Sequence, residues 1–194
     1  MSVIGILGAG NVARALQPKL AAAGHEVRMG RLTVAALAGA DVVVNALPGA
    51  VAVEVLGPLK DVLAGKVLVD VANAVVQGAD GFAERLLYRN LAAELQRILP
   101  DTRVVKALNT VGPAALMVDP GALGVPVSVF LCGDDPAAKG VVVGLLAELG
   151  WPREWVLDLG GVEQAWWPES FVLMVRPLIA QLGPVPFALS IARG

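Results

Sequence analysis

Short runs of apolar residues recur along the chain, and most are bounded by glycine, proline, asparagine or aspartate. Within the runs the apolar positions are continuous and do not alternate with polar ones. That pattern is typical of strands in a parallel sheet whose two faces are both covered. It predicts strands at residues 3–7, 26–29, 41–47, 66–71, 103–107 and 125–131, and a seventh at 155–157.

Segments with a helical period separate these strands, at residues 11–23, 33–38, 51–63, 90–99 and 136–149. Asn90 and Asp135 each stand where a helix N-cap is expected, and Pro136 follows at the first helical position. Regular alternation of strand and helix predicts an α/β fold, a doubly wound, mostly parallel sheet of the Rossmann type.

The pattern changes after Asp158, so we expect a dinucleotide-binding domain over residues 1–158 and a C-terminal helical segment over 159–194. Residues 162–182 read as helix, with Pro168 and Pro177 kinking or splitting it. Five successive apolar positions at 171–175 wrap around that helix, which is more than its own core can bury. We therefore expect the apolar C-terminus to dock on its own domain or on a partner, and the protein to form a homodimer.

Composition narrows the function classes. Of 194 residues, 56% are hydrophobic and 16% are charged, which excludes a mainly disordered chain. The net charge of −2 provides no basic field for nucleic acid or an anionic membrane. A single cysteine, Cys132, excludes a disulfide scaffold and suggests a reducing compartment. The apolar stretch 166–182 is interrupted by Glu169 and Arg176, and the N-terminus lacks signal-peptide features, so we expect a cytoplasmic protein without a membrane span.

The clearest motif is the G-x-G-x-x-A sequence formed by Gly8, Ala9, Gly10, Asn11, Val12 and Ala13, directly after the first strand and opening the first helix. Gly8 permits a tight turn, Gly10 lets the backbone approach a pyrophosphate, and Ala13 allows close packing of helix and strand. The helix N-terminus then offers unpaired N–H groups to the anion. The motif predicts a dinucleotide site, against the alternative of a chance glycine turn.

The end of the second strand indicates which dinucleotide binds. NAD sites usually place an acidic residue there, about 20 residues beyond the glycines. This strand ends with Gly30 and Arg31, and Glu26 lies at its opposite end. Since Arg31 can pair with a 2′-phosphate, we expect NADP(H) in preference to NAD, unless Arg31 is an ordinary solvated arginine.

Other strand ends should meet at the same edge of the sheet. Leu47 and Pro48 follow the third strand, Ala72 and Asn73 the fourth, and Asn109 the fifth. They could border the nicotinamide, although Asn73 and Asn109 could equally fix turns. We expect structural roles for His25, for a buried Cys132 and for the Trp166–Trp167 pair, and we expect Arg176 to pair with an acid across an interface.

Four segments of the sequence resemble a known family. Residues 4–12, 22–27, 67–73 and 103–111 are similar in order and spacing to the NADP-dependent F420 (deazaflavin) oxidoreductase-like dinucleotide-binding proteins, to which the cytoplasmic domains of the STEAP metalloreductases are related. The resemblance implies that Gly30 and Arg31 hold the 2′-phosphate, and that Leu47, Pro48, Ala72 and Asn73 wall the nicotinamide. The family usually has Ser or Thr where this chain has Gly30, and Thr and Pro where it has Ala72 and Ala74.

We therefore expect an NADP(H)-binding oxidoreductase that transfers hydride to a small-molecule electron acceptor such as a deazaflavin or flavin. Such chemistry needs ring stacking and water exclusion, and no catalytic side chain or metal is predicted. Residues 159–194 are too few for the large helical second domain of a pyrroline-carboxylate reductase. The alternative is a non-catalytic NADP(H)-binding redox sensor or scaffold, which the missing polar residues at Gly30, Ala72 and Ala74 favour.

Overall fold

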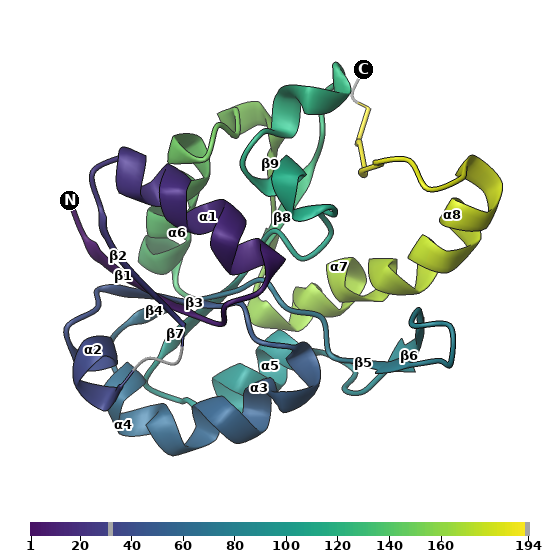
Figure 1. Cartoon of the computed structure of the whole chain (residues 1–194). Coiled ribbons are helices and arrows are strands. Elements are labelled where there is room, and N and C mark those ends of the chain that lie inside the picture. Colours follow the sequence, from purple (N-terminus) through teal and green to yellow (C-terminus); the bar gives the residue numbers. More distant parts are fainter. Residues whose placement is uncertain (31–32, 193–194) are drawn as a thin grey trace.

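The computed structural model of the chain (Figure 1) describes residues 1–30 and 33–192. It has three layers: a seven-stranded sheet in the order β2-β1-β3-β4-β7-β8-β9 with helices on both faces. The strands are β1 (Val3–Leu7), β2 (Glu26–Gly30), β3 (Val42–Asn45), β4 (Val67–Asp70), β7 (Arg103–Lys106), β8 (Val129–Cys132) and β9 (Val156–Gly160). The predicted α/β fold with a mostly parallel sheet is confirmed.

Strands β2, β1, β3, β4 and β7 are all parallel to one another, whereas β8 pairs antiparallel with β7 and parallel with β9. Strand β8 begins at Val129, later than the predicted start at residue 125. The reason is that the preceding residues pair with the C-terminal tail: the Ser128 N–H donates to the Leu189 carbonyl at 2.8 Å. Pro126, which has no N–H, cannot extend the ladder.

The helices cover both faces as their apolar stripes require. Figure 1 shows α1 (Asn11–Ala22) and α6 (Pro136–Glu148) on one face, and α2 (Val34–Ala38), α3 (Gly49–Leu56), α4 (Lys60–Leu63) and α5 (Leu91–Ile98) on the other. The side chains of Asn90 and Asp135 cap α5 and α6 as predicted, accepting hydrogen bonds from the Ala93 and Ala138 N–H groups at 3.0 Å each.

The single helix predicted for residues 51–63 is wrong. It is divided into α3 and α4 by a 3₁₀ turn at Gly57–Leu59. Pro58 is the cause, because it lacks the N–H that a continuous α-helix would need at that position. The sequence analysis also did not predict the antiparallel hairpin of β5 (Val75–Gln77) and β6 (Ala83–Leu86), which lies between β4 and α5.

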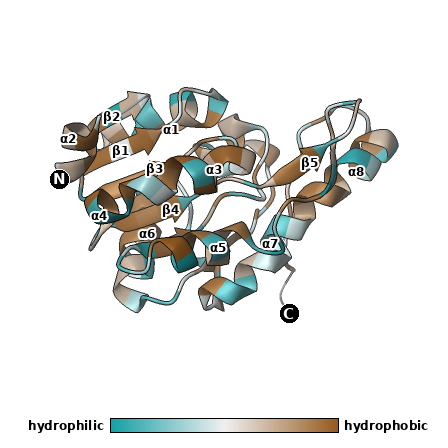
Figure 2. Cartoon of the chain, turned by 90° about the horizontal axis from the view of Figure 1, so that it is seen from below, coloured by the Kyte–Doolittle hydropathy of each residue, from teal (hydrophilic) through white to brown (hydrophobic). Residues whose placement is uncertain are grey.

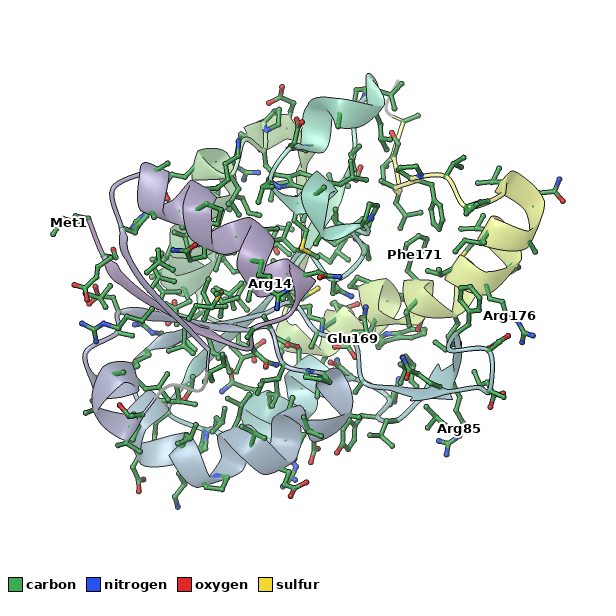
Figure 3. The ribbon with its side chains drawn as sticks, viewed as in Figure 1. Met1, Arg14, Arg85, Glu169, Phe171 and Arg176 are labelled. Atoms are coloured by element: carbon green, nitrogen blue, oxygen red, sulfur yellow. The ribbon has the colours of Figure 1, made fainter. Side chains whose placement is uncertain are left out.

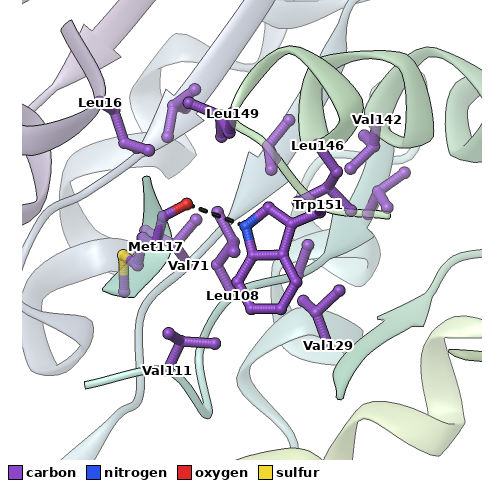
Figure 4. Close-up of a cluster of buried hydrophobic side chains, with 14 of the residues drawn as sticks. Leu16, Val71, Leu108, Val111, Met117, Val129, Val142, Leu146, Leu149 and Trp151 are labelled. Atoms are coloured by element: carbon purple, nitrogen blue, oxygen red, sulfur yellow. Dashed lines mark hydrogen bonds between the residues drawn. The ribbon is translucent and has the colours of Figure 1, made fainter. Parts of the chain in front are cut away.

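Two hydrophobic cores lie on the two faces of the sheet, and Figure 2 shows the strands β1, β3 and β4 as largely hydrophobic. In the first core Trp151 packs among Val129, Leu146 and Leu149 (Figure 4). Its indole N–H donates to the Met117 carbonyl at 2.9 Å, so the one polar atom of this buried ring is paired. His25 contacts Glu148 at 2.7 Å, which confirms its structural role.

The C-terminal arm, which we define as residues 162–192, crosses the carboxyl edge of the sheet (Figure 1). It contains 3₁₀ turns at Val162–Ala165 and Phe171–Met174, followed by α7 (Trp166–Ser170) and α8 (Val175–Leu182) respectively. The predicted splitting is confirmed: Pro168 and Pro177 are each the third residue of an α-helical piece, where the missing N–H is not needed.

The tail of the arm docks on its own domain. Phe187 forms a bridge with Gly112, and the Ile191 N–H donates to the Ser128 hydroxyl at 2.9 Å. Arg176 contacts Asp80 of the β5–β6 turn at 2.8 Å, so its predicted acidic partner belongs to the same chain. No helix within residues 1–30 and 33–192 is long and apolar enough to cross a membrane.

Candidate functional site

The two glycines of the G-x-G-x-x-A motif are present for different physical reasons. Gly8 has φ = +124°, and a Cβ on it would overlap the carbonyl group of Ala46, at the end of β3. Its role in a tight turn is thereby explained. Gly10, the N-cap of α1, has an ordinary φ of −80°, and nothing lies within 4 Å of where its Cβ would be. No described protein contact requires glycine there.

The space beside Gly10 adjoins the open end of α1. Ala9, Gly10 and Asn11 are exposed, the first turn of the helix carries no acidic residue, and none of the described side chains caps it. Its N–H groups therefore face a region that a ligand can enter. Ala13 is fully buried, as close packing of α1 against the sheet requires.

This helix start lies at the point where the strand order reverses, because β1 is flanked by β2 on one side and β3 on the other. Open α/β sheets bind ligands at such a position. Gly30 ends β2 beside it, and its carbonyl accepts from the Gly8 N–H at 3.4 Å. The φ of Gly30 is +115°, a conformation that disfavours the Ser or Thr usual in the family. Arg31 lies outside the described residues.

A pocket of about 580 Å³ opens at the same edge of the sheet, next to α1. One wall comes from the sheet side: Val12 of α1, Val71 and Asn73 after β4, and residues 109–113 after β7. The C-terminal arm supplies the opposite wall, with the following lining residues: Phe171, Val172, Val175, Ile179, Pro184, Val185, Pro186 and Phe187. Of the residues found to line this pocket, none has a titratable side chain.

Three of the predicted cofactor-binding residues, Val12, Asn73 and Asn109, line this pocket. Leu47 and Pro48 lie at the start of α3, half-buried and exposed respectively, and Ala72 is buried. The packing of Gly49 fixes the position of α3, since a Cβ there would overlap the Asn73–Ala74 peptide. These predicted residues therefore lie along one edge of the sheet.

Asn73 and Asn109 join the loops that follow β4 and β7. The Asn73 amide N–H donates to the Asn109 carbonyl at 2.8 Å, and the Asn109 amide N–H donates to the Asn73 Oδ1 at 2.9 Å. Leu108, just before Asn109, has φ = +61°, which is uncommon for a bulky residue and concentrates at binding sites. Both asparagines therefore fix turns, and the Asn109 Oδ1 has no donor among the described residues.

A buried cluster of charges behind the pocket was not predicted. Lys106, Asp70 and Glu169 are 0%, 0% and 1% exposed. The Lys106 Nζ lies 2.7 Å from Asp70 Oδ2, 2.8 Å from Glu169 Oε1 and 2.6 Å from the Ala72 carbonyl oxygen. Burial lowers the pKa of Lys106, but the two carboxylates outweigh that effect and raise it, so the ammonium stays charged. The sequence did carry one signal for this cluster: two apolar strands each end in a charged residue, Asp70 in β4 and Lys106 in β7.

Cys132 is buried at the end of β8, and burial raises the pKa of its thiol to about 12. A thiol that stays protonated at neutral pH is a poor nucleophile. The expected structural role of Cys132 is in agreement with this environment. The site chemistry therefore rests on backbone N–H groups, two amides and apolar walls.

Comparisons with known proteins agree with this geometry. No family model matches the chain. A crystal structure from Arthrobacter sp. FB24, described as a candidate F420-dependent NADP reductase, superposes with a TM-score of 0.90 at 35% identity, covering 100% of both chains. The chain belongs to the F420-dependent NADP reductase-like family.

Two curated relatives extend this family assignment. Metalloreductase STEAP3 of Rattus norvegicus is 32% identical over 191 residues, or 90% of this chain and 37% of that protein. The F420-dependent NADP reductase of Methanocaldococcus jannaschii is 28% identical over 147 residues, or 73% of this chain and 61% of that protein. The chain thus spans about a third of the first relative and three fifths of the second.

The two glycines predict opposite stability effects. Gly8→Ala should lower the free energy of unfolding by about 2 kcal/mol or more, because it adds a Cβ at a positive φ and against a carbonyl. Gly10→Ala should cost about 1 kcal/mol or less, the size of an N-cap preference, since its φ is ordinary and no described atom lies within 4 Å of its Cβ position. Urea unfolding followed by circular dichroism measures both. Equal destabilisation of the two variants would contradict this account of the loop.

Proposed function

We propose that this protein binds NADP(H) and transfers hydride between its nicotinamide and a second planar ring, of the flavin or deazaflavin type. The observation that carries the proposal is the 580 Å³ pocket beside the glycine loop, whose described lining is mostly apolar and free of titratable groups. Hydride transfer between two rings needs stacking and exclusion of water, whereas oxidation of an alcohol also needs a proton relay. The names of the relatives support the same class of reaction.

The cofactor would lie along the carboxyl edge of the sheet. Residues Gly8 to Val12 would hold the pyrophosphate at the α1 N-terminus, where the space beside Gly10 is open. Gly30 and Arg31 would hold the 2′-phosphate. The nicotinamide would then reach the edge formed by these residues: Leu47, Pro48, Ala72, Asn73 and Asn109.

When bound, NADPH supplies the hydride, and the residues of this chain orient and protect the reacting rings. The loops after β4 and β7 would set the distance between the rings, since the Asn73–Asn109 pair fixes both. Phe171, Val172 and Phe187 would exclude water from the opposite side. No protein group has to gain or lose a proton in such a step.

The decisive experiment is NADPH titration followed by anaerobic stopped-flow mixing with riboflavin and, separately, with a deazaflavin. We expect micromolar-range binding and loss of NADPH absorbance at a rate that depends on the acceptor. Gly10→Val should remove binding while the protein stays folded, because its side chain fills the space assigned to the pyrophosphate. Tight binding with no transfer to either ring would instead establish the non-catalytic sensor or scaffold.

Arg31 provides a test of cofactor choice. A charge-assisted pair with the 2′-phosphate is worth about 1.5–3 kcal/mol, so Arg31→Ala should weaken NADPH binding by roughly tenfold or more. NADH binding should hardly change, because that cofactor lacks the phosphate. Isothermal titration with both cofactors measures the two affinities, and parallel weakening of both would show that Arg31 does not read the phosphate.

We further propose that the protein is a homodimer joined through its C-terminal arm. Met174 and Leu182 are 52% and 51% exposed and do not line the pocket, so the arm presents apolar side chains outward after it has covered its own pocket. Light scattering should give twice the 19.9 kDa mass of one chain. Met174→Glu with Leu182→Glu should give the monomer mass, whereas a monomeric wild type at micromolar concentration would refute the dimer.

A further inference from the structure

The ammonium group of Lys106 contacts three separate segments of the chain. Its three N–H donors have three acceptors: Asp70 at the end of β4, the Ala72 carbonyl in the loop after β4, and Glu169 in α7. The nitrogen is therefore fully satisfied without water. Lys106 itself is the last residue of β7, so four elements meet at one buried charge.

Each of these contacts lies next to a wall of the 580 Å³ pocket, which we call the ring pocket because it would hold the two reacting rings. Ala72 stands between Val71 and Asn73, both of which line it. Glu169 comes two residues before Phe171, the first residue of the arm that lines it, and Figure 3 shows the two close together along the arm. Lys106 comes three residues before Asn109, which belongs to the sheet-side wall.

Glu169 is anchored on its other side by helix α5. Its Oε2 accepts from the Leu91 N–H at 2.7 Å, and its Oε1 accepts from the Ala92 N–H at 3.1 Å. A carboxylate at a helix N-terminus is favoured by the unpaired N–H groups there. Asn90 adds a link to the arm, since its amide N–H groups donate to the carbonyls of Val162 at 3.0 Å and Glu163 at 3.1 Å.

Stability alone does not account for this cluster. A buried ion pair often contributes no more to stability than well-packed apolar residues of similar volume, whereas removal of one partner leaves a costly buried charge. What such a cluster does provide is geometry, because charge-assisted hydrogen bonds between groups without access to water fix the elements that carry them.

We propose that Lys106 and Glu169 are positioning residues that set the distance between the sheet-side wall of the ring pocket and the C-terminal arm opposite. Lys106 holds the Ala72 carbonyl and Glu169 at once, so one buried cation defines both walls. Neither side chain lines the pocket, and each acts through its neighbours in sequence. The expected effect on hydride transfer rests on the proposed function, whereas the expected effect on the position of the arm does not.

Glu169→Gln is the sharpest test. Three N–H groups, of Lys106, Leu91 and Ala92, use the two carboxylate oxygens of Glu169, and glutamine offers a single oxygen, so at least one contact must be lost. Asp70 still neutralises Lys106, which keeps the fold accessible. We expect faster hydrogen exchange in residues 162–182 and a roughly tenfold or greater fall in hydride transfer to riboflavin, because a misplacement of about 1 Å is that costly. The Kd of NADPH should change by a much smaller factor than the transfer rate, because the glycine loop assigned to the pyrophosphate is not attached to the cluster.

A matched control separates positioning from loss of stability. Leu20→Ala removes a side chain that is 2% exposed from the core that packs α1 and α6 on the sheet, and the buried residues of that core include none from the arm. At an equal loss of Tm it should leave both the exchange of the arm and the transfer rate unchanged. If it raises arm exchange as much as Glu169→Gln does, or if Glu169→Gln leaves arm exchange at the wild-type level, the proposal is overturned.

Lys106→Met gives a second measurement, and we expect it to raise arm exchange and to slow hydride transfer as Glu169→Gln does. If either variant loses NADPH affinity by the same factor as it loses transfer rate, the proposal is overturned. If Lys106→Met does not fold, Glu169→Gln still decides. If the wild type reduces neither riboflavin nor a deazaflavin, the proposed function is refuted. The positioning role is still tested in that case, because hydrogen exchange in the arm is measured without any ligand.

Discussion

A lysine ammonium group enclosed by protein on every side organises the functional edge of this molecule. The Lys106 Nζ has acceptors from β4, from the loop that follows β4, and from the C-terminal arm. Asp70 already pairs with this fully buried charge from within the sheet, and the arm brings Glu169 to the same nitrogen as a second carboxylate. The pocket is the space that remains between the sheet edge and the arm once this contact has formed.

The cluster also reaches the neighbouring strand. Asp70 Oδ1 accepts from the Asn45 amide at 2.8 Å, and Asn45 Oδ1 accepts from the Leu47 N–H at 3.3 Å. Polar contacts therefore run along the ends of β3, β4 and β7 and continue to the N-terminus of α5. Beside this fixed edge the start of α1 stays open, with free space next to Gly10. A rigid wall adjacent to an uncapped helix start suits a ligand that is anionic at one end and planar at the other.

Much of the fold could be predicted from local pattern. Continuous apolar runs located the seven strands of the main sheet, and the caps Asn90 and Asp135 located the starts of two helices, because these signals lie within a few residues of the structures they specify. The failures also have local causes. Pro58 divides a predicted helix, and the hairpin of β5 and β6 is too short to show a clear alternation of apolar and polar residues. The start of β8 was misplaced because its pairing partner is the tail, some 60 residues later in the chain.

The glycine loop could be predicted from the sequence, since the spacing of Gly8, Gly10 and Ala13 between a strand and a helix is a local signal. The strand ends that meet could be predicted as well, because parallel strands share one carboxyl edge. Two contacts appear only in the folded chain: Glu169 lies against Lys106, and Phe187 pairs with Gly112 and closes the pocket. These contacts join residues more than 60 positions apart, and a charged residue within an apolar run does not specify its partner until packing has excluded water from both.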